Sequence, residues 1–365
     1  MDNTHIYEYL FAAVIAIAIL VASSVIVTTM PSAQLSASDK EQVKIAAEKV
    51  MTQVLLNSGQ PPNWGSDTSI SESNLQDFGL AKYHESTREA YVLDPDNVQR
   101  LDSGNPLYIS PSVVAHLLNL DATAPQLNLA NSYGFTLDIH PLLKVQISPL
   151  PSDPDSYNVT VSSEYQALPV VNAQVTAMLY YPEGATINYQ TASGTTHFNG
   201  SCSLTFSSVP DPGMKILVVS AEYMGIHTTQ VYASQSAAKA HLFGDKLLVD
   251  SLSIISTTKF TEVIATKQAG QYVISNFNVQ GSTGLDAPTG FRAYTLSSAE
   301  PSVVAVLFLS DDQTLYYASK NIDATFSTIP NLPSSSSLLS YSLERTAIIG
   351  DTTCTVRLQL WRMTY

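Results

Sequence analysis

The chain has 365 residues and a formal net charge of −14 at pH 7, and only 13% of its residues are charged. This length allows two or three domains with ordinary cores. The low charge and the wealth of Ser, Thr, Asn, Gln and Tyr are typical of an extracytoplasmic β-protein and exclude a disordered tail. The acidic balance also argues against a nucleic-acid partner, because binding to phosphates needs a basic surface.

The N-terminal segment predicts a membrane anchor. Tyr9–Ser38 contains no Asp, Glu, Lys or Arg, and the apolar run within it, Leu10–Met30, is 21 residues long. As a helix this run would reach roughly 30 Å, the thickness of a hydrocarbon core. A secretion signal has a shorter apolar run behind a basic segment, whereas this run follows Asp2 and Glu8. We therefore expect residues 1–37 to form an N-terminal tail and an uncleaved, single-pass transmembrane helix.

Two features bear on the orientation of this anchor. Lys40, Lys44 and Lys49 follow the apolar run and no Lys or Arg precedes it, which by the positive-inside rule favours an outside N-terminus. Long domains cross membranes largely regardless of such charges, and the large domain holds two candidate N-glycosylation sites, Asn158 and Asn199. We therefore predict a cell-membrane protein with its N-terminus inside, its ectodomain outside and the lipid bilayer as a partner.

An amphipathic helix is predicted directly after the anchor. Ser38 and Glu41 have the spacing of a capping box, and apolar residues recur at helical intervals from Val43 to Leu55. The segment "NSGQPP" ends the helix, because Gly59 can adopt a left-handed conformation and the prolines after it cannot continue the helix. In the following "PPNWG" turn, Trp64 is expected to pack over the end of the helix.

Seven short segments carry a resemblance to a known group of proteins. They are "LLNSGQPPNWG", "FGLAKY", "YVLDPDNVQRL", "VVAHLLNL" and "YGFTLDIHP", with "LERTAIIG" and "TVRLQLWRM" near the C-terminus. These segments are similar to archaeal pilin-like surface proteins, in which one N-terminal transmembrane helix leads into a helix, a P-x-N-W turn and an F/I-G-L-A strand. The archaeal class III processing site, a basic residue and a glycine before the apolar run, is absent here. The resemblance therefore implies a membrane-anchored surface protein more firmly than an assembled pilus.

Residues 38–148 are taken as a membrane-proximal helix followed by a mixed α/β region, and residues 149–238 as a β-sandwich. In the second region six β-branched and aromatic runs alternate with turn signals: "YNVTVSS", "PVVNAQVTAMLYY", "ATINYQ", "CSLTF", "KILVVSAEYMG" and "HTTQVYA". The run "PVVNAQVTAMLYY" is similar to the opening strands of transthyretin-like or bacterial Ig-like modules, where a glycine-marked hairpin follows. Here "HFNGSCSLTF" would be that hairpin. Such modules are spacers or adhesive stalks.

A second β-rich domain is predicted at residues 239–365. Its candidate strands are "KLLVDSLSII", "KFTEVIA", "QYVISNFNV", "SVVAVLFLS", "TLYYAS", "SYSLERTAIIG" and "TCTVRLQLW", with "SDDQ" as a hairpin turn. The predicted fold is therefore mainly β, with an N-terminal transmembrane helix, a following amphipathic helix and a β-sandwich ectodomain.

Motifs that carry chemistry are scarce in this sequence. There is no H-E-x-x-H, G-x-S-x-G, G-x-G-x-x-G, Walker loop or C-x-x-C, and no pair among the seven His residues has metal-ligand spacing. Asp153–Glu164 imitates three positions of a calcium-binding EF-hand loop but lacks its glycine and runs into a strand. We predict no catalytic residue, no metal, no cofactor and no small-molecule substrate, and expect that the protein is not an enzyme.

Cys202 and Cys354 are the only cysteines in the chain. Outside the cell a pair of cysteines favours a disulfide. A bridge, however, needs the two Cα atoms within about 7 Å, and two separate sandwiches seldom bring central strands so close. Two buried free thiols are therefore the preferred prediction, with the disulfide as the alternative.

Two functions remain compatible with these observations. The first is a membrane-anchored structural or adhesive surface protein, as a pilin-like minor component, which contacts other surface or envelope proteins. The alternative is a membrane-anchored binding protein or an accessory subunit of a secretion or surface enzyme complex.

Overall fold

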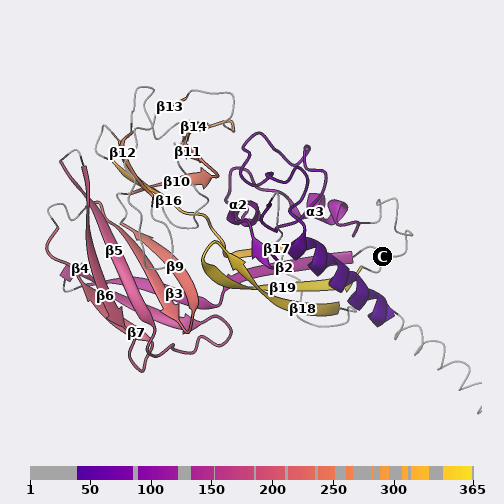
Figure 1. Cartoon of the computed structure of the whole chain (residues 1–365), viewed down its shortest axis with the longest axis horizontal. Helices are drawn as coiled ribbons and strands as arrows, with labels where there is room; N and C mark the ends of the chain where they lie inside the picture. Colours follow the sequence, from indigo (N-terminus) through magenta and orange to yellow (C-terminus); the bar gives the residue numbers. More distant parts are fainter. Residues whose placement is uncertain are drawn as a thin grey trace, which may run out of the picture.

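The structure, a computed structural model, describes residues 39–84, 89–121, 133–151, 153–184, 186–209, 213–234, 237–250, 260–265, 281–282, 288–295, 306–310, 314–328 and 340–363 (Figure 1). It is mainly β, and the described strands form four sheets. The predicted anchor at residues 1–37 lies outside the described residues. Within the described ranges, no helix combines the length and the apolar character needed to cross a bilayer.

The amphipathic helix is confirmed, since residues 39–56 are helical. Its apolar stripe is at most 4% exposed and consists of Val43, Ala47, Val50, Met51, Val54 and Leu55. Lys40 and Lys49 are exposed on the opposite side. The stripe belongs to the same hydrophobic cluster as the five-stranded sheet described below, so the helix is held by tertiary packing rather than by its own propensity.

The "PPNWG" turn closes the helix as predicted. Gly59 has a φ of +82°, and a Cβ atom there would lie 2.6 Å from Trp64 Nε1, so only glycine fits. The Trp64 side chain is fully buried. Its Nε1 donates to the carbonyl oxygens of Ser58 at 3.0 Å and Gly79 at 3.2 Å. The indole therefore ties the end of the helix to the segment that follows.

The five-stranded sheet and two short helices form, with the N-terminal helix, a unit that we call the base. The sheet order is β1-β18-β19-β2-β17. The elements are β1 (Val92–Leu93), α2 (Pro95–Gln99), α3 (Pro111–Leu117), β2 (Tyr133–Pro141), β17 (Ala324–Ser327), β18 (Ser340–Ile349) and β19 (Thr352–Arg362). Because β2 and β17 are neighbours, all of the chain between residues 142 and 323 is one insertion between two paired strands.

This pairing differs from the predicted division at residues 148 and 239. The C-terminal strands β17, β18 and β19 complete the sheet that β1 and β2 begin, so the predicted membrane-proximal and C-terminal regions share one sheet. The physical reason is long-range pairing. Strand β19 pairs with β2 from Cys354 opposite Pro141 to Arg362 opposite Tyr133, a register that no local pattern reveals.

The first part of the insertion is a β-sandwich. One sheet contains β3 (Leu143–Leu150), β4 (Asp153–Ser163) and β7 (Ser201–Thr205), in the order β3-β4-β7. The other contains β5 (Gln174–Glu183), β6 (Thr186–Thr195), β8 (Ile216–Tyr223) and β9 (Ile226–Ala233), in the order β6-β5-β8-β9. Both contribute to one core, with members such as Val159, Val161, Leu179, Leu204 and Val219. All six predicted runs are strands, and β3 moves the start of the sandwich from residue 149 to residue 143.

The predicted hairpin at "HFNGSCSLTF" is wrong. Gly200, with φ +74°, closes a tight turn in which its N–H donates to the His197 carbonyl at 2.9 Å. The turn joins β6 to β7, but β6 pairs with β5 and β7 pairs with β4. The chain therefore crosses from one sheet of the sandwich to the other, which lets the two strands pack face to face instead of side by side.

The second part of the insertion is a seven-stranded sheet with the order β12-β15-β16-β10-β11-β14-β13. Its strands are β10 (Ala238–Phe243), β11 (Lys246–Asp250), β12 (Phe260–Ala265), β13 (Gly281–Ser282), β14 (Phe291–Thr295), β15 (Val306–Ser310) and β16 (Leu315–Ala318). Strands β15 and β16 pair antiparallel, as expected around "SDDQ". The predicted strand "QYVISNFNV" lies outside the described residues.

The seven-stranded sheet covers the outer face of the sandwich. Leu315 of β16 joins a cluster with Met178, Tyr180, Ile216 and Val218, which alternate with the core residues of β5 and β8. Strand β8 is consequently buried on both faces over Ile216–Ala221. This explains why its sequence is an unbroken apolar run rather than an alternating one.

Candidate functional site

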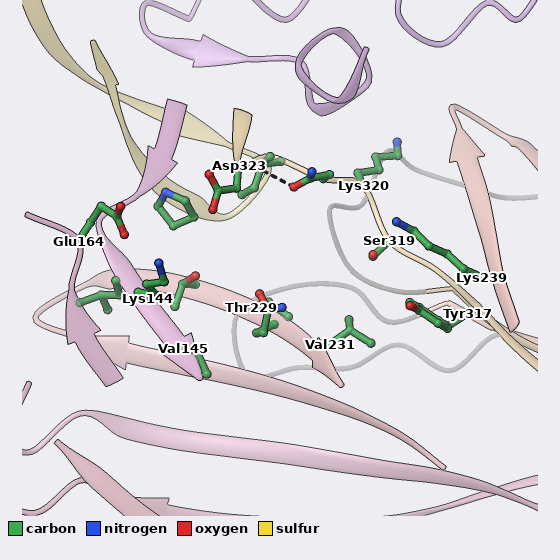
Figure 2. Close-up of a pocket in the computed structure, with 16 residues that line it drawn as sticks. Lys144, Val145, Glu164, Thr229, Val231, Lys239, Tyr317, Ser319, Lys320 and Asp323 are labelled. Carbon is green, nitrogen blue, oxygen red and sulfur yellow. Dashed lines mark hydrogen bonds between the residues drawn. The ribbon is translucent and has the colours of Figure 1, made fainter. Parts of the chain in front are cut away.

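A cavity of about 390 Å³ lies where the base, the sandwich and the seven-stranded sheet meet (Figure 2). The corner between β2 and β3 and the end of β4 form one side of it. Strand β9 forms another, and β10, β16 and the segment from residue 319 to 323 complete it. The lining residues are Pro141, Leu143, Lys144, Val145, Glu164, Thr228, Thr229, Gln230, Val231, Lys239, Tyr317, Ser319, Lys320, Asn321, Ile322 and Asp323.

Charged side chains of both signs stand around this junction cavity. Figure 2 shows Glu164 and Lys144 on one side and Lys239 on the other, with Asp323 between them at the top of the view. Asp323 Oδ1 lies 2.6 Å from His140 Nδ1, and both side chains are partly exposed. The cavity therefore offers two lysines and two carboxylates to whatever enters it.

The fifth charged residue, Lys320, is directed into the protein. Its Nζ lies 2.8 Å from Asp96 Oδ1, and the two side chains are 0% and 2% exposed. Asp96 Oδ1 also accepts from Gln99 Nε2 at 2.8 Å, and its Oδ2 accepts from the Gly244 N–H at 3.2 Å. The ion pair thus joins helix α2, the turn between β10 and β11, and the strand connection that lines the cavity. Separating a buried pair leaves an uncompensated charge, so the pair favours the arrangement in which these elements stay together.

Asp94 begins helix α2 and adds a second carboxylate to this interface. Its Oδ1 accepts from the Asp96 N–H at 2.8 Å, the contact of an N-cap residue. Burial and the neighbouring charge of Asp96 raise the pKa of Asp94 to about 6. The interface between the base and the seven-stranded sheet therefore contains a group that titrates near neutral pH.

The junction cavity has the size of a small-molecule site and a polar lining. Its volume lies within the usual range of small-molecule sites, about 300–1,000 Å³, but those sites are mostly apolar. Its lysines and carboxylates suit a small polar molecule. Among the residues described, no three His, Cys, Asp or Glu side chains converge as a metal site.

The two glycosylation candidates lie in different settings. Asn199 is exposed in the turn before β7, where its Oδ1 accepts from Ser201 N at 3.2 Å and Ser201 Oγ at 2.8 Å. Asn158 is half-buried in the middle strand of a sheet, opposite Ser148 of β3 and Ser203 of β7. The turn makes Asn199 the more accessible of the two.

Both cysteines are free and buried in the structure. Cys202 belongs to the core of the sandwich and Cys354 to the core of the base. Burial raises the pKa of both thiols. Because the two residues lie in separate hydrophobic clusters, the structure contains no disulfide between them.

The calcium alternative at Asp153–Glu164 falls on strand β4, which ends at Ser163. Asp153 Oδ2 accepts from Ser156 Oγ at 2.6 Å, and Asp155 forms a buried ion pair with Lys215. Two of the three carboxylates of this segment are therefore engaged within the protein, and the third, Glu164, lines the junction cavity.

Sequence reasoning missed the buried charged residues. They are Arg100, the pair of Asp96 and Lys320, and the pair of Asp155 and Lys215. One signal was present: Lys215 stands directly before the apolar run Ile216–Val219, where a side chain has no route to solvent if the strand is covered on both faces.

No protein-family model matches the chain, and the comparison with curated proteins finds no significant match. The function is therefore argued from the residues and their geometry.

Proposed function

We propose that the protein is a membrane-anchored, extracytoplasmic structural or adhesive surface protein. One observation carries this proposal: the chain builds a base from its two ends and carries everything else as an insertion. The N-terminal helix, which follows the apolar segment, and the C-terminal strands β18 and β19 pack in one hydrophobic cluster. In Figure 1 the sandwich lies at the opposite end of the molecule from that helix.

The base has the construction expected of an attachment point. Arg362 Nη1 of β19 donates to Asp39 Oδ1 of the N-terminal helix at 2.6 Å, so the last described strand is tied to the residues nearest the predicted anchor. Arg100 is fully buried and donates to the carbonyl oxygens of Trp64, Ile70 and Leu107. We call the sandwich and the seven-stranded sheet together the head. A force applied to the head would reach the anchor through the base, in which these contacts connect distant segments.

The resemblance to archaeal pilin-like surface proteins supports the same proposal, and it suggests other surface or envelope proteins as partners. It assigns no catalytic role, cofactor or nucleic acid to the chain. The two candidate N-glycosylation sites and the scarcity of charged residues agree with an extracellular location of the large domain. The N-terminus would then lie inside, with a single membrane span.

The junction cavity favours one alternative function. A polar cavity lined by strands of all four sheets suits a membrane-anchored binding protein or an accessory subunit, whose ligand would be small and charged. We rank this second, because one of the two carboxylates at the cavity, Asp323, is already paired with His140.

The test is made on intact cells that produce the full-length chain. A protease added outside should degrade the ectodomain while a cytoplasmic marker survives, and extraction of the chain should require detergent. Shearing then separates the two functions: a structural fibre component pellets with sheared fibres, whereas a binding subunit stays with the membranes. Protection from the external protease, or release without detergent, would overturn the proposal.

A further inference from the structure

Lys215 and Asp155 form a buried contact that crosses the sandwich. Asp155 lies in β4 of the three-stranded sheet, and Lys215 lies directly before β8 of the four-stranded sheet. Lys215 Nζ contacts Asp155 Oδ1, and the two side chains are only 4% and 9% exposed. The pair thus connects two sheets that share a core but have no strand of one hydrogen-bonded to a strand of the other.

Backbone contacts hold both residues in place. The Asp155 carbonyl accepts from the Phe206 N–H at 3.0 Å, which fixes it to the end of β7. Lys215 N–H donates to Ser234 Oγ at 2.9 Å, and Ser234 N–H donates back to the Lys215 carbonyl at 2.9 Å. The amino group and the carboxyl group therefore stay in contact without rearrangement of either strand. Such positioning makes the reaction between the two groups effectively unimolecular.

The pair lies beside an aromatic cluster, and Lys215 Nζ also donates to the Pro154 carbonyl at 3.3 Å. Tyr157, in the same strand as Asp155, packs edge to face against Phe206 at 6.0 Å and Tyr232 at 5.7 Å between ring centres. Near the carboxyl group, the Val209 N–H donates to Asp155 Oδ2 at 3.2 Å. Amide formation starts from the neutral forms of such a pair, because only an amine with a free electron pair can attack a carboxyl carbon. Transfer of one proton from the ammonium to the carboxylate supplies both neutral forms.

We propose that Lys215 and Asp155 become joined by an intramolecular amide bond. Lys215 Nζ attacks Asp155 Cγ, the new C–N bond forms and the bond from Cγ to one carboxyl oxygen breaks. That oxygen leaves as water with two protons from the original ammonium group. The ion pair and the products, one amide and one water, balance without an oxidant, a reductant or another reactant.

The other buried pair shows what an ionic arrangement looks like in the same chain. Asp96 accepts from Gln99 Nε2 and from the Gly244 N–H, and its Oδ1 lies 2.8 Å from Lys320 Nζ in an ion pair without hydrogen-bond geometry. Asp155 accepts from Lys215 and one backbone N–H. Lys215 Nζ thus donates directly to its carboxylate whereas Lys320 Nζ does not, and we expect the pair of Asp96 and Lys320 to stay unlinked.

The bond would give the sandwich a covalent tie between its sheets, and its use for resisting force rests on the proposed surface function. A pull that separates β4 from β8 would have to break an amide rather than a hydrophobic interface. The bond itself is tested by mass, independently of location, so its absence would leave the cell-surface proposal standing and its presence would not establish it.

The experiment is a peptide map of the purified, deglycosylated and denatured full-length chain. Trypsin cuts after Lys144, Lys215 and Lys239, with no other lysine or arginine between them. An amide at Lys215 blocks cleavage there and gives one peptide, residues 145–239, lighter than its sequence by one water. A second protease that cuts after glutamate then leaves residues 145–164 covalently joined to residues 184–222. Cleavage after Lys320 in the same digest shows that burial in the native fold does not limit digestion.

Two variants complete the design. Lys215→Arg keeps the positive charge but cannot form the bond, and Asp155→Ala removes the carboxyl group, so both should give separate peptides of unmodified mass. Separate, unmodified peptides from the wild-type chain would overturn the proposal, whether or not either variant folds. Loss of water with the two fragments still separable would also overturn it, because that is the signature of a cyclised aspartate rather than of a cross-link.

Discussion

The base and the sandwich reach stable cores by different routes. In the sandwich, strands adjacent in sequence supply most of the pairing, as in β3 with β4, β5 with β6 and β8 with β9. Its buried polar residues include one ion pair and a few hydroxyl side chains such as Thr196. The base depends on strands from opposite ends of the chain and on buried polar groups, with Trp64, Arg100 and Asp96 each held by several partners. The sandwich is therefore expected to fold locally, and the base to close last.

The largest expected effect on stability comes from the interface between the base and the seven-stranded sheet. Lys320→Met removes the partner of Asp96 and leaves a buried carboxylate without its counter-ion, which should cost about 3–5 kcal/mol of unfolding free energy. Chemical denaturation followed by circular dichroism measures it. The matched control is Arg357→Met, because the Arg357–Glu344 pair, 3.5 Å apart, is 43% and 46% exposed. That change should cost no more than about 1 kcal/mol, and equal losses in the two variants would contradict the role of burial.

A core truncation in the sandwich should stay local. Leu179 is fully buried in that core, and Leu179→Ala should destabilise the sandwich by about 2–5 kcal/mol, through lost contacts and a residual cavity. Hydrogen exchange should show faster opening of β4, β5 and β8 with the amides of β2 and β19 unchanged. Equal acceleration in β2 and β19 would mean that the two parts unfold as one unit.

The difference between local and distant pairing also explains what could be foreseen. The sandwich strands were predictable, because each is a compact apolar run bounded by turns, and so was the buried stripe of the N-terminal helix. The partnership of β2 with β19 was not, since a strand pattern shows that a segment pairs but not with what. The buried ion pairs and the junction cavity were missed for the same reason: they exist only where distant segments meet.

A smaller effect, dependent on pH, is expected at the interface itself. The pKa of Asp94 is raised to about 6 from its ordinary 3.8. At pH values between these two, the folded protein therefore binds a proton that the unfolded chain has released. The native protein should therefore gain stability as the pH falls from 7 through 6 towards 4. Asp94→Asn keeps an oxygen for the helix cap but removes the charge, and should stabilise the protein by about 1–3 kcal/mol at pH 7.

The measurement is the difference in unfolding free energy between wild type and Asp94→Asn at pH 7 and at pH 4.5. The stabilisation should shrink towards zero at the lower pH, where Asp94 is protonated in the folded state. A difference that does not change with pH would show that Asp94 acts only as a helix cap.

The smallest perturbation uses the cysteines, since each part of the molecule contains one. Cys202 lies in the core of the sandwich and Cys354 in that of the base, and a maleimide can reach either only when its own part opens. Under native conditions the two thiols should therefore react at different, independent rates, without any change in stability before labelling. Leu179→Ala should accelerate Cys202 alone, whereas Arg100→Met, which removes three donors to backbone carbonyls in the base, should accelerate Cys354 alone. As a control, two labelled thiols in the denatured, unreduced chain confirm that neither was oxidised. Equal labelling rates of the two thiols in every variant would show that base and head open as one unit.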